Sequence, residues 1–211
     1  MTPNRVTAAR VAAAFTAVAL FHFGADQFAA DLAAVILTVA AIALDGLDGY
    51  LARSRGLATP LGAQIDILGD RVVENLFFTF FAVSGLITLW VPVLFFARGA
   101  VTDFLRGLAA RSGRTSMLDT WWGRTLVASR ASRGAYAILK CVCFCCLGIL
   151  LVLRHLPLAG FNTWLLGAGQ GLTGITAAFC LVRAIPVIWD GRRYFASARK
   201  DRPLMAAGGI R

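Results

Sequence analysis

Long apolar stretches constrain this chain more than any other feature of its sequence. A bilayer core about 30 Å thick is spanned by roughly 20 residues of α-helix. Stretches of that kind lie at residues 6–23, 28–51, 61–86, 87–108, 134–153 and 164–189. With 58% hydrophobic and 15% charged residues, the chain has more apolar surface than one water-soluble core can bury. The sequence therefore predicts an all-α integral membrane protein with six transmembrane helices.

The connections between these stretches carry turn residues. Gly24, Ala25 and Asp26 separate the first two stretches. The connection at 54–60 is short and polar and ends in Thr59-Pro60, which is typical of a helix start. We expect the turn between the third and fourth helices around residues 89–92. No internal repeat or linker stands out, so we expect one six-helix domain over residues 1–195 and a basic tail over 196–211.

The basic residues indicate how the chain is oriented in the membrane. The net charge is +10, and the loops predicted to lie opposite the termini contain only Arg154 as a basic residue. The positive-inside rule then predicts that both termini are cytoplasmic, in a multi-pass protein of the plasma membrane. Attraction to anionic lipid explains this charge better than nucleic-acid binding does. The first stretch is long for a signal peptide and lacks a small-residue cleavage site, so we expect it to be retained.

Cysteines and glycines are interpreted as packing residues. The five cysteines all lie in predicted membrane spans, which argues against a disulfide framework or a zinc finger. Four glycines of the last span form a candidate seam for close helix packing, within the chain or between two copies. They are Gly167, Gly169, Gly171 and Gly174.

Four aspartates interrupt two of the apolar stretches: Asp45, Asp48, Asp66 and Asp70. An acid in a membrane helix costs roughly 2.5 to 3.5 kcal/mol on insertion scales, so four of them require a cation or a water-filled cavity. Residues three or four apart share a helix face, and the short connection makes the second and third helices antiparallel neighbours. Their carboxylates are therefore expected to meet at the cytoplasmic end. Hard oxygen ligands favour Mg²⁺, Mn²⁺ or Ca²⁺ over zinc.

Small residues accompany the acids. Gly49, Ala52 and Gly62 remove side-chain bulk beside the carboxylates, and Arg53 supplies a forked cation suited to phosphate. This combination favours a site for a nucleotide diphosphate. Paired acids inside a membrane also serve metal-ion or proton transport, which is the alternative function.

The pattern Asp45-x2-Asp48-Gly49-x2-Ala52-Arg53-x8-Gly62-x3-Asp66-x3-Asp70 resembles the complete signature of the CDP-alcohol phosphotransferases. The segment Pro3-Asn4-x2-Thr7-x2-Arg10 is similar to the N-terminal segment of that family. The resemblance covers essentially the whole chain. It implies an enzyme that transfers a phosphatidyl group from CDP-diacylglycerol to an alcohol and releases CMP.

The resemblance also implies roles for individual residues. Asp45, Asp48, Asp66 and Asp70 would hold two ions of Mg²⁺ or Mn²⁺, and Asp70 would also act as the general base. Six residues would bind the CDP moiety: Gly49, Ala52, Arg53, Gly62, Asn4 and Thr7. Members of the family commonly form homodimers.

The acceptor alcohol is expected to be anionic. Candidate ligands for its phosphate are Arg98, Arg106, Arg130 and Arg133. The run Ser129-Arg130-x2-Arg133 is similar to members that use inositol phosphate, with serine in place of glutamate. Arg106-Gly107-Leu108-Ala109 followed by Gly113 is similar to members that use glycerol 3-phosphate. A phosphorylated polyol is therefore expected, and its identity stays open. A catalytically silent lipid-binding scaffold with the same fold is a third hypothesis.

Overall fold

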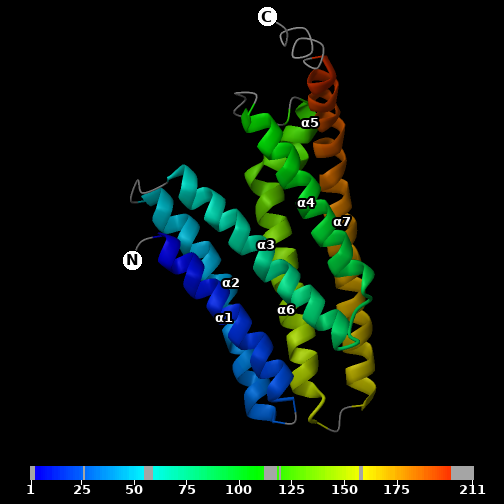
Figure 1. The fold of residues 1–211 in the computed structure, drawn as a ribbon. Helices are drawn as coiled ribbons and strands as arrows, with labels where there is room; N and C mark the ends of the chain where they lie inside the picture. Colours follow the sequence, from blue (N-terminus) through cyan, green and yellow to red (C-terminus); the bar gives the residue numbers. More distant parts are fainter. Residues whose placement is uncertain are drawn as a thin grey trace, which may run out of the picture. The chain divides into compact units, whose positions relative to one another are not determined.

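The structure is a computed structural model that describes residues 3–25, 27–54, 59–111, 118, 120–156 and 159–200. Within these ranges, side chains are described except at 3–4, 45–54, 60, 111, 128, 130, 159–162 and 193–200. The described secondary structure is helical throughout (Figure 1). The long helices are α1 (Pro3–Phe23), α2 (Phe28–Ser54), α3 (Pro60–Val83), α4 (Trp90–Arg111), α6 (Arg130–Leu153) and α7 (Ala159–Lys200). Two short elements, α5 (Trp121–Gly123) and the π-helical η1 (Arg124–Ala128), precede α6.

Six long helices match the six predicted stretches in order, which confirms the all-α class. Three described segments are long and apolar enough to span a membrane: Arg5–Phe23, Trp121–Leu153 and Thr163–Arg192. A shorter apolar helix covers Phe28–Leu44. Charged residues interrupt the apolar character of α3 and α4, at Asp66 to Glu74 and at Arg98 to Arg106 respectively. The protein is thus a membrane protein with several candidate transmembrane helices.

The chain forms two compact units. The first contains Met1–Phe96 and Ala137–Ala177, and the second contains Ala97–Tyr136 and Ala178–Arg211. In the first unit, α1 packs against both α2 and α3 (Figure 1). This packing brings α1 to the helix that carries two of the predicted metal-binding aspartates.

Phenylalanine rings form the core of the first unit. Phe78 of α3 contacts Phe95 of α4 and Phe144 of α6, with ring centroids 4.3 Å and 4.8 Å apart. Phe21 of α1 stacks on Phe80 at 5.5 Å. Aromatic rings bury large areas and prefer such offset or tilted geometries, so this cluster packs α3 against α1, α4 and α6.

Helix α3 has well-defined ends. The Thr59 side chain accepts a hydrogen bond from the Gly62 amide at 3.0 Å, and Pro60 occupies the first helical position. This confirms the predicted helix start. At the other end, the Leu86 amide donates to the Phe81 carbonyl at 3.0 Å, and Gly85 adopts a φ of +75°. These features form a Schellman motif, which terminates the helix.

The turn between α3 and α4 therefore lies at residues 84–89, and the expectation of residues 89–92 was wrong by several positions. Pro92 suggested a turn, but it lies in the first turn of α4. A proline is tolerated there because the first amides of a helix have no intrahelical acceptor. Gly85 is the residue that ends α3.

The second unit has a smaller core of Leu105, Leu118 and Val187. Gly191 of α7 lies directly on Leu105 of α4, since a Cβ at residue 191 would be 2.6 Å from the leucine Cδ1. Asp190 is 2% exposed and accepts hydrogen bonds from the Thr120 amide and hydroxyl at 3.2 Å and 2.9 Å. These contacts fix the start of α5 against α7.

Candidate active site

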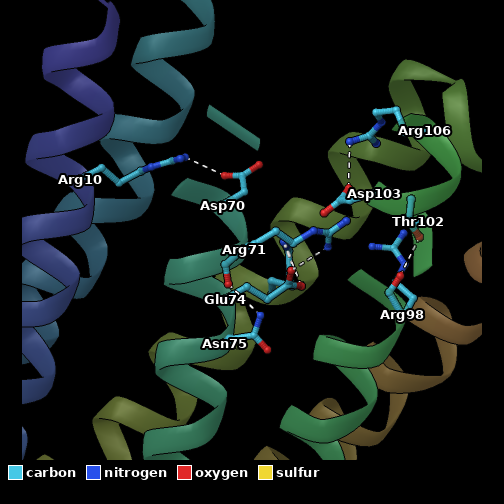
Figure 2. A network of polar contacts seen from close by, with 10 residues as sticks. Arg10, Asp70, Arg71, Glu74, Asn75, Arg98, Thr102, Asp103 and Arg106 are labelled. Carbon is cyan, nitrogen blue, oxygen red and sulfur yellow. Dashed lines mark hydrogen bonds and ion pairs between the residues drawn. The ribbon is translucent and has the colours of Figure 1, made fainter. Parts of the chain in front are cut away.

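Two of the predicted metal-binding aspartates converge on one buried arginine. Arg10 of α1 is only 2% exposed. Its Nη1 donates to Asp70 Oδ1 at 2.8 Å, and its Nη2 lies 3.3 Å from Asp66 Oδ1 (Figure 2 shows the contact with Asp70). Asp66 and Asp70 are one helical turn apart on α3, so their side chains share a face. Both remain about half exposed, with side-chain exposures of 46% and 48%.

Gly69 lets α1 approach α3 at this point. A Cβ at residue 69 would lie 2.8 Å from Arg10 Nη2 and 2.8 Å from Thr7 Cγ2. Thr7, a predicted CDP contact, is 4% exposed and packs on this glycine. The absence of a side chain at Gly69 thus leaves the space through which the guanidinium reaches the two carboxylates.

A second ion cluster lies one turn further along α3. Glu74 is 3% exposed, and Arg71 Nη1 lies 3.4 Å from its carboxylate (Figure 2). Lys140 Nζ of α6 also lies 3.4 Å from this carboxylate. Asn75 donates to the Arg71 carbonyl at 2.9 Å. Lys140 lies 66 positions after Glu74 in the sequence, so the local spacing of charges in α3 gave no signal for this contact. Burial of Glu74 between two cations compensates its charge inside the first unit.

In the second unit, Arg183 of α7 holds the junction between η1 and α6. It is 5% exposed, and its Nη atoms donate to the carbonyls of Leu126 at 3.0 Å and Val127 at 3.1 Å, and to the Ser132 hydroxyl. The Ser132 hydroxyl in turn donates to the Leu126 carbonyl at 2.5 Å. The last carbonyl groups of a helix have no intrahelical donor, and Arg183 donates hydrogen bonds to two such carbonyls of η1.

Arg98 and Arg183 share one aromatic ring. Their guanidinium carbons lie 5.9 Å and 5.2 Å from the centroid of Tyr136. The Nε of each is buried without a hydrogen-bond partner among the described residues. Two guanidinium groups that share a tyrosine ring suit an anionic ligand such as a phosphate.

Of the other three arginines predicted for the acceptor, two have described side chains, and these two differ in their surroundings. Arg106 pairs with Asp103 on the same face of α4, at 3.1 Å (Figure 2). Arg133 is exposed in the first turn of α6. Arg106 thus already has a carboxylate partner, whereas Arg133 lies on the surface.

The sequence matches the family model described as CDP-alcohol phosphatidyltransferase over residues 1–182, which is most of the chain. The chain belongs to the CDP-alcohol phosphatidyltransferase family. Two curated relatives, from the CDC 1551 / Oshkosh and H37Rv strains of Mycobacterium tuberculosis, are both named probable phosphatidylglycerophosphate synthase. Each is 31% identical over 109 residues, which is 52% of this chain and 51% of the relative. The chain thus spans about half the length of the curated relatives it matches.

Part of the family signature lies outside the described side chains. Asp45, Asp48, Gly49, Ala52 and Arg53 lie within the bounds of α2, but their side chains are not among those described. The same holds for Asn4 in α1 and Arg130 in α6. Among the described residues, no group of three or more His, Cys, Asp or Glu side chains is arranged to hold a metal ion. The meeting of acids from α2 and α3 therefore stays a prediction.

The described half of the site fits a divalent cation. Asp66 and Asp70 are hard oxygen donors on one face of α3, partly open to solvent and oriented toward a common cation, the Arg10 guanidinium. Sequence reasoning matched Arg10 to the family's N-terminal segment but missed its pairing with these acids. An arginine inside an apolar helix requires an anionic partner, and that requirement was the available signal.

Proposed function

We propose that this protein transfers a phosphatidyl group from CDP-diacylglycerol to an alcohol and releases CMP, in phospholipid biosynthesis. The observation that carries the proposal is the complete signature, two of whose acids, Asp66 and Asp70, point to the same side of α3 and remain half exposed. Membership of the family over residues 1–182 supports the same reaction.

The proposed metal ligands are the four signature acids, Asp45, Asp48, Asp66 and Asp70, with Mg²⁺ or Mn²⁺ as the two ions. When bound, these ions neutralise the donor pyrophosphate and the charge that develops on the departing CMP. In the reaction, the acceptor hydroxyl oxygen bonds to the phosphatidyl phosphorus. The bond from that phosphorus to the CMP oxygen breaks, and CMP leaves with the electron pair. Asp70 takes the proton of the hydroxyl.

Binding of the donor is assigned to small and polar residues around the acids. Gly49, Ala52 and Gly62 give the CDP moiety access to the helix backbone, and Arg53 provides a cation for its phosphates. Asn4 and Thr7 are proposed contacts from α1. Thr7 packs on Gly69, beside both described acids, which supports this assignment.

The proposed acceptor is a phosphorylated polyol such as glycerol 3-phosphate or an inositol phosphate. Arg98, Arg106, Arg130 and Arg133 are its candidate ligands, and the Arg98 guanidinium is positioned over the Tyr136 ring. The name of the Mycobacterium tuberculosis relatives, probable phosphatidylglycerophosphate synthase, favours glycerol 3-phosphate as the first acceptor to assay.

The proposed setting is the plasma membrane, with six transmembrane helices, cytoplasmic termini and the site at the cytoplasmic end. Residues 1–195 would form the catalytic domain and residues 196–211 a basic cytoplasmic tail. The distribution of arginine and lysine supports this orientation. A homodimer is proposed from family resemblance.

The test is CMP release by purified protein in detergent with CDP-diacylglycerol and Mn²⁺. We expect release to depend on an added acceptor and to fall about 10²–10⁴-fold in Asp70→Asn, because a positioned general base contributes about that factor. Asp201→Asn, beyond the residues that match the family model, is the matched control and should retain activity. Parallel reactions with glycerol 3-phosphate, inositol 1-phosphate, serine and free inositol identify the acceptor.

Two outcomes would contradict the proposal. Cation flux in proteoliposomes without CMP release would favour the transporter. Binding of CDP-diacylglycerol with neither flux nor CMP release would favour the silent scaffold.

A further inference from the structure

Arg10 is a buried arginine that contacts two acids of α3, Asp66 and Asp70. It is 2% exposed in an apolar helix, and its two Nη atoms divide between carboxylates one helical turn apart, at 2.8 Å and 3.3 Å. Nη2 also lies 3.4 Å from the Asp66 backbone carbonyl. A planar guanidinium donates in fixed directions, so contacts of this kind set the orientation of both carboxylates.

The contact has a steric requirement on α3. Residue 69 lies between the two aspartates in sequence, and any Cβ there would be 2.8 Å from Arg10 Nη2. An alanine at residue 69 would therefore force the guanidinium to shift without removing any charge from the cluster. The glycine is outside the eight signature positions, so its role is separate from the chemistry assigned to them.

Two effects of Arg10 on cation binding have opposite signs. A fixed positive charge beside Asp66 and Asp70 repels a divalent cation. Orientation of the carboxylates raises cation affinity, and loss of partners that orient metal ligands typically costs about 10–100-fold in affinity or activity. The two effects are separable by experiment because they predict opposite changes when the charge is removed.

We propose that Arg10 is a positioning residue that orients Asp66 and Asp70 for divalent-cation binding, and that Gly69 is the clearance through which it reaches them. The inference rests on the proposed function, because it takes these acids as cation ligands. Arg10 acts through the two aspartates and is assigned no contact with substrate.

The test measures Mn²⁺ dissociation constants of full-length protein in detergent by electron paramagnetic resonance, with thermal unfolding recorded without metal. We expect Arg10→Gln, Arg10→Lys and Gly69→Ala each to weaken Mn²⁺ binding about tenfold or more. Arg5→Gln is the matched control for Arg10, since Arg5 is an exposed arginine of the same helix. Gly107→Ala is the control for Gly69, because a Cβ at residue 107 meets no atom within 4 Å. Both controls should bind Mn²⁺ as the unmodified protein does.

Each result decides the inference. Tighter Mn²⁺ binding by Arg10→Gln with unchanged binding by Arg10→Lys would show that Arg10 acts only as a charge. Unchanged Mn²⁺ binding in variants with lowered unfolding temperature would show that it only joins α1 to α3. Should Arg10→Gln not fold, Arg10→Lys and Gly69→Ala decide alone. Failure of the proposed function is distinct: unmodified protein would then bind no Mn²⁺, or Asp70→Asn would bind it equally well.

Discussion

Asp31 of α2 is completely buried, although it carries a carboxylate. Its Oδ2 accepts a hydrogen bond from Arg154 Nη2 at 2.9 Å, and His155 Nε2 lies 2.9 Å from the same oxygen. Arg154 also donates to the Ala25 carbonyl, in the turn between α1 and α2. These contacts join the turn after α1 to the turn after α6.

The two ends of this ion pair differ in exposure, which predicts unequal effects of mutation. Arg154→Gln leaves a fully buried carboxylate whose remaining described contact is His155, and we expect a loss of about 3 kcal/mol of unfolding free energy. Asp31→Asn leaves an arginine side chain that is 39% exposed and can turn to water, so we expect about 1–3 kcal/mol. Unfolding in detergent with denaturant measures both, with the exposed Arg124→Gln as control. The reverse order of the two losses would contradict this account.

Pairings of this kind explain which parts of the site could be predicted. The spacing of Asp66 and Asp70 places both on one helix face, and the structure confirms this because both reach Arg10. The partners Arg10 and Lys140 come from helices far away in the sequence. Local periodicity carries no information about which distant helix packs on a given face, so these contacts appear only in the fold.

At the scale of elements, the sequence predicted the start of α3 correctly but not its end. Its start at Thr59-Pro60 was predicted because the cap is a local signal. Its end was misplaced because the apolar character continues past Val83 into Leu86 and Ile87. The helix ends because Gly85 adopts a positive φ, and hydropathy does not change at this point.

Gly85, at the end of α3, allows backbone strain to be tested without side-chain clashes. Gly85 has a φ of +75°, and a Cβ there would meet no atom within 4 Å. We expect Gly85→Ala to lower the unfolding free energy by about 1–2 kcal/mol, because the left-handed region costs an L-residue about that much. Gly107→Ala, at a helical glycine with equally open space, should be neutral or slightly stabilising. Equal unfolding temperatures for the two variants in detergent would refute the strain at residue 85.

At the scale of the whole molecule, hydropathy predicted six long helices, and the structure has them. Three described segments are long and apolar enough to span a membrane. The charged residues that reduce apolar length in α3 and α4 include four to which we assign binding roles: Asp66, Asp70, Arg98 and Arg106. Charged residues of the candidate site thus lower the hydropathy of α3 and α4, which makes these helices harder to identify as membrane spans from hydropathy alone.

Orientation in the membrane is testable by cysteine labelling. In protein whose five cysteines are replaced by alanine, Ser84→Cys lies in the exposed turn after α3, and Ser116→Cys lies in the sequence between α4 and α5. If the termini are cytoplasmic, a membrane-impermeant maleimide should label residue 84 on intact cells and residue 116 only after permeabilisation. Labelling of both residues from outside, or the reverse pattern, would contradict the proposed topology. CMP release by the cysteine-free protein checks that it is folded.

The contact of Arg10 with α3 has a consequence for biogenesis. The ribosome completes α1 before it synthesises Asp66 and Asp70, so a counter-ion for these acids is already in or near the bilayer when they arrive. Partitioning of an acidic helix into lipid is costly unless its charge is compensated. If α3 spans the membrane as proposed, its pairing with the earlier helix α1 lowers the free-energy cost of inserting α3 during translation.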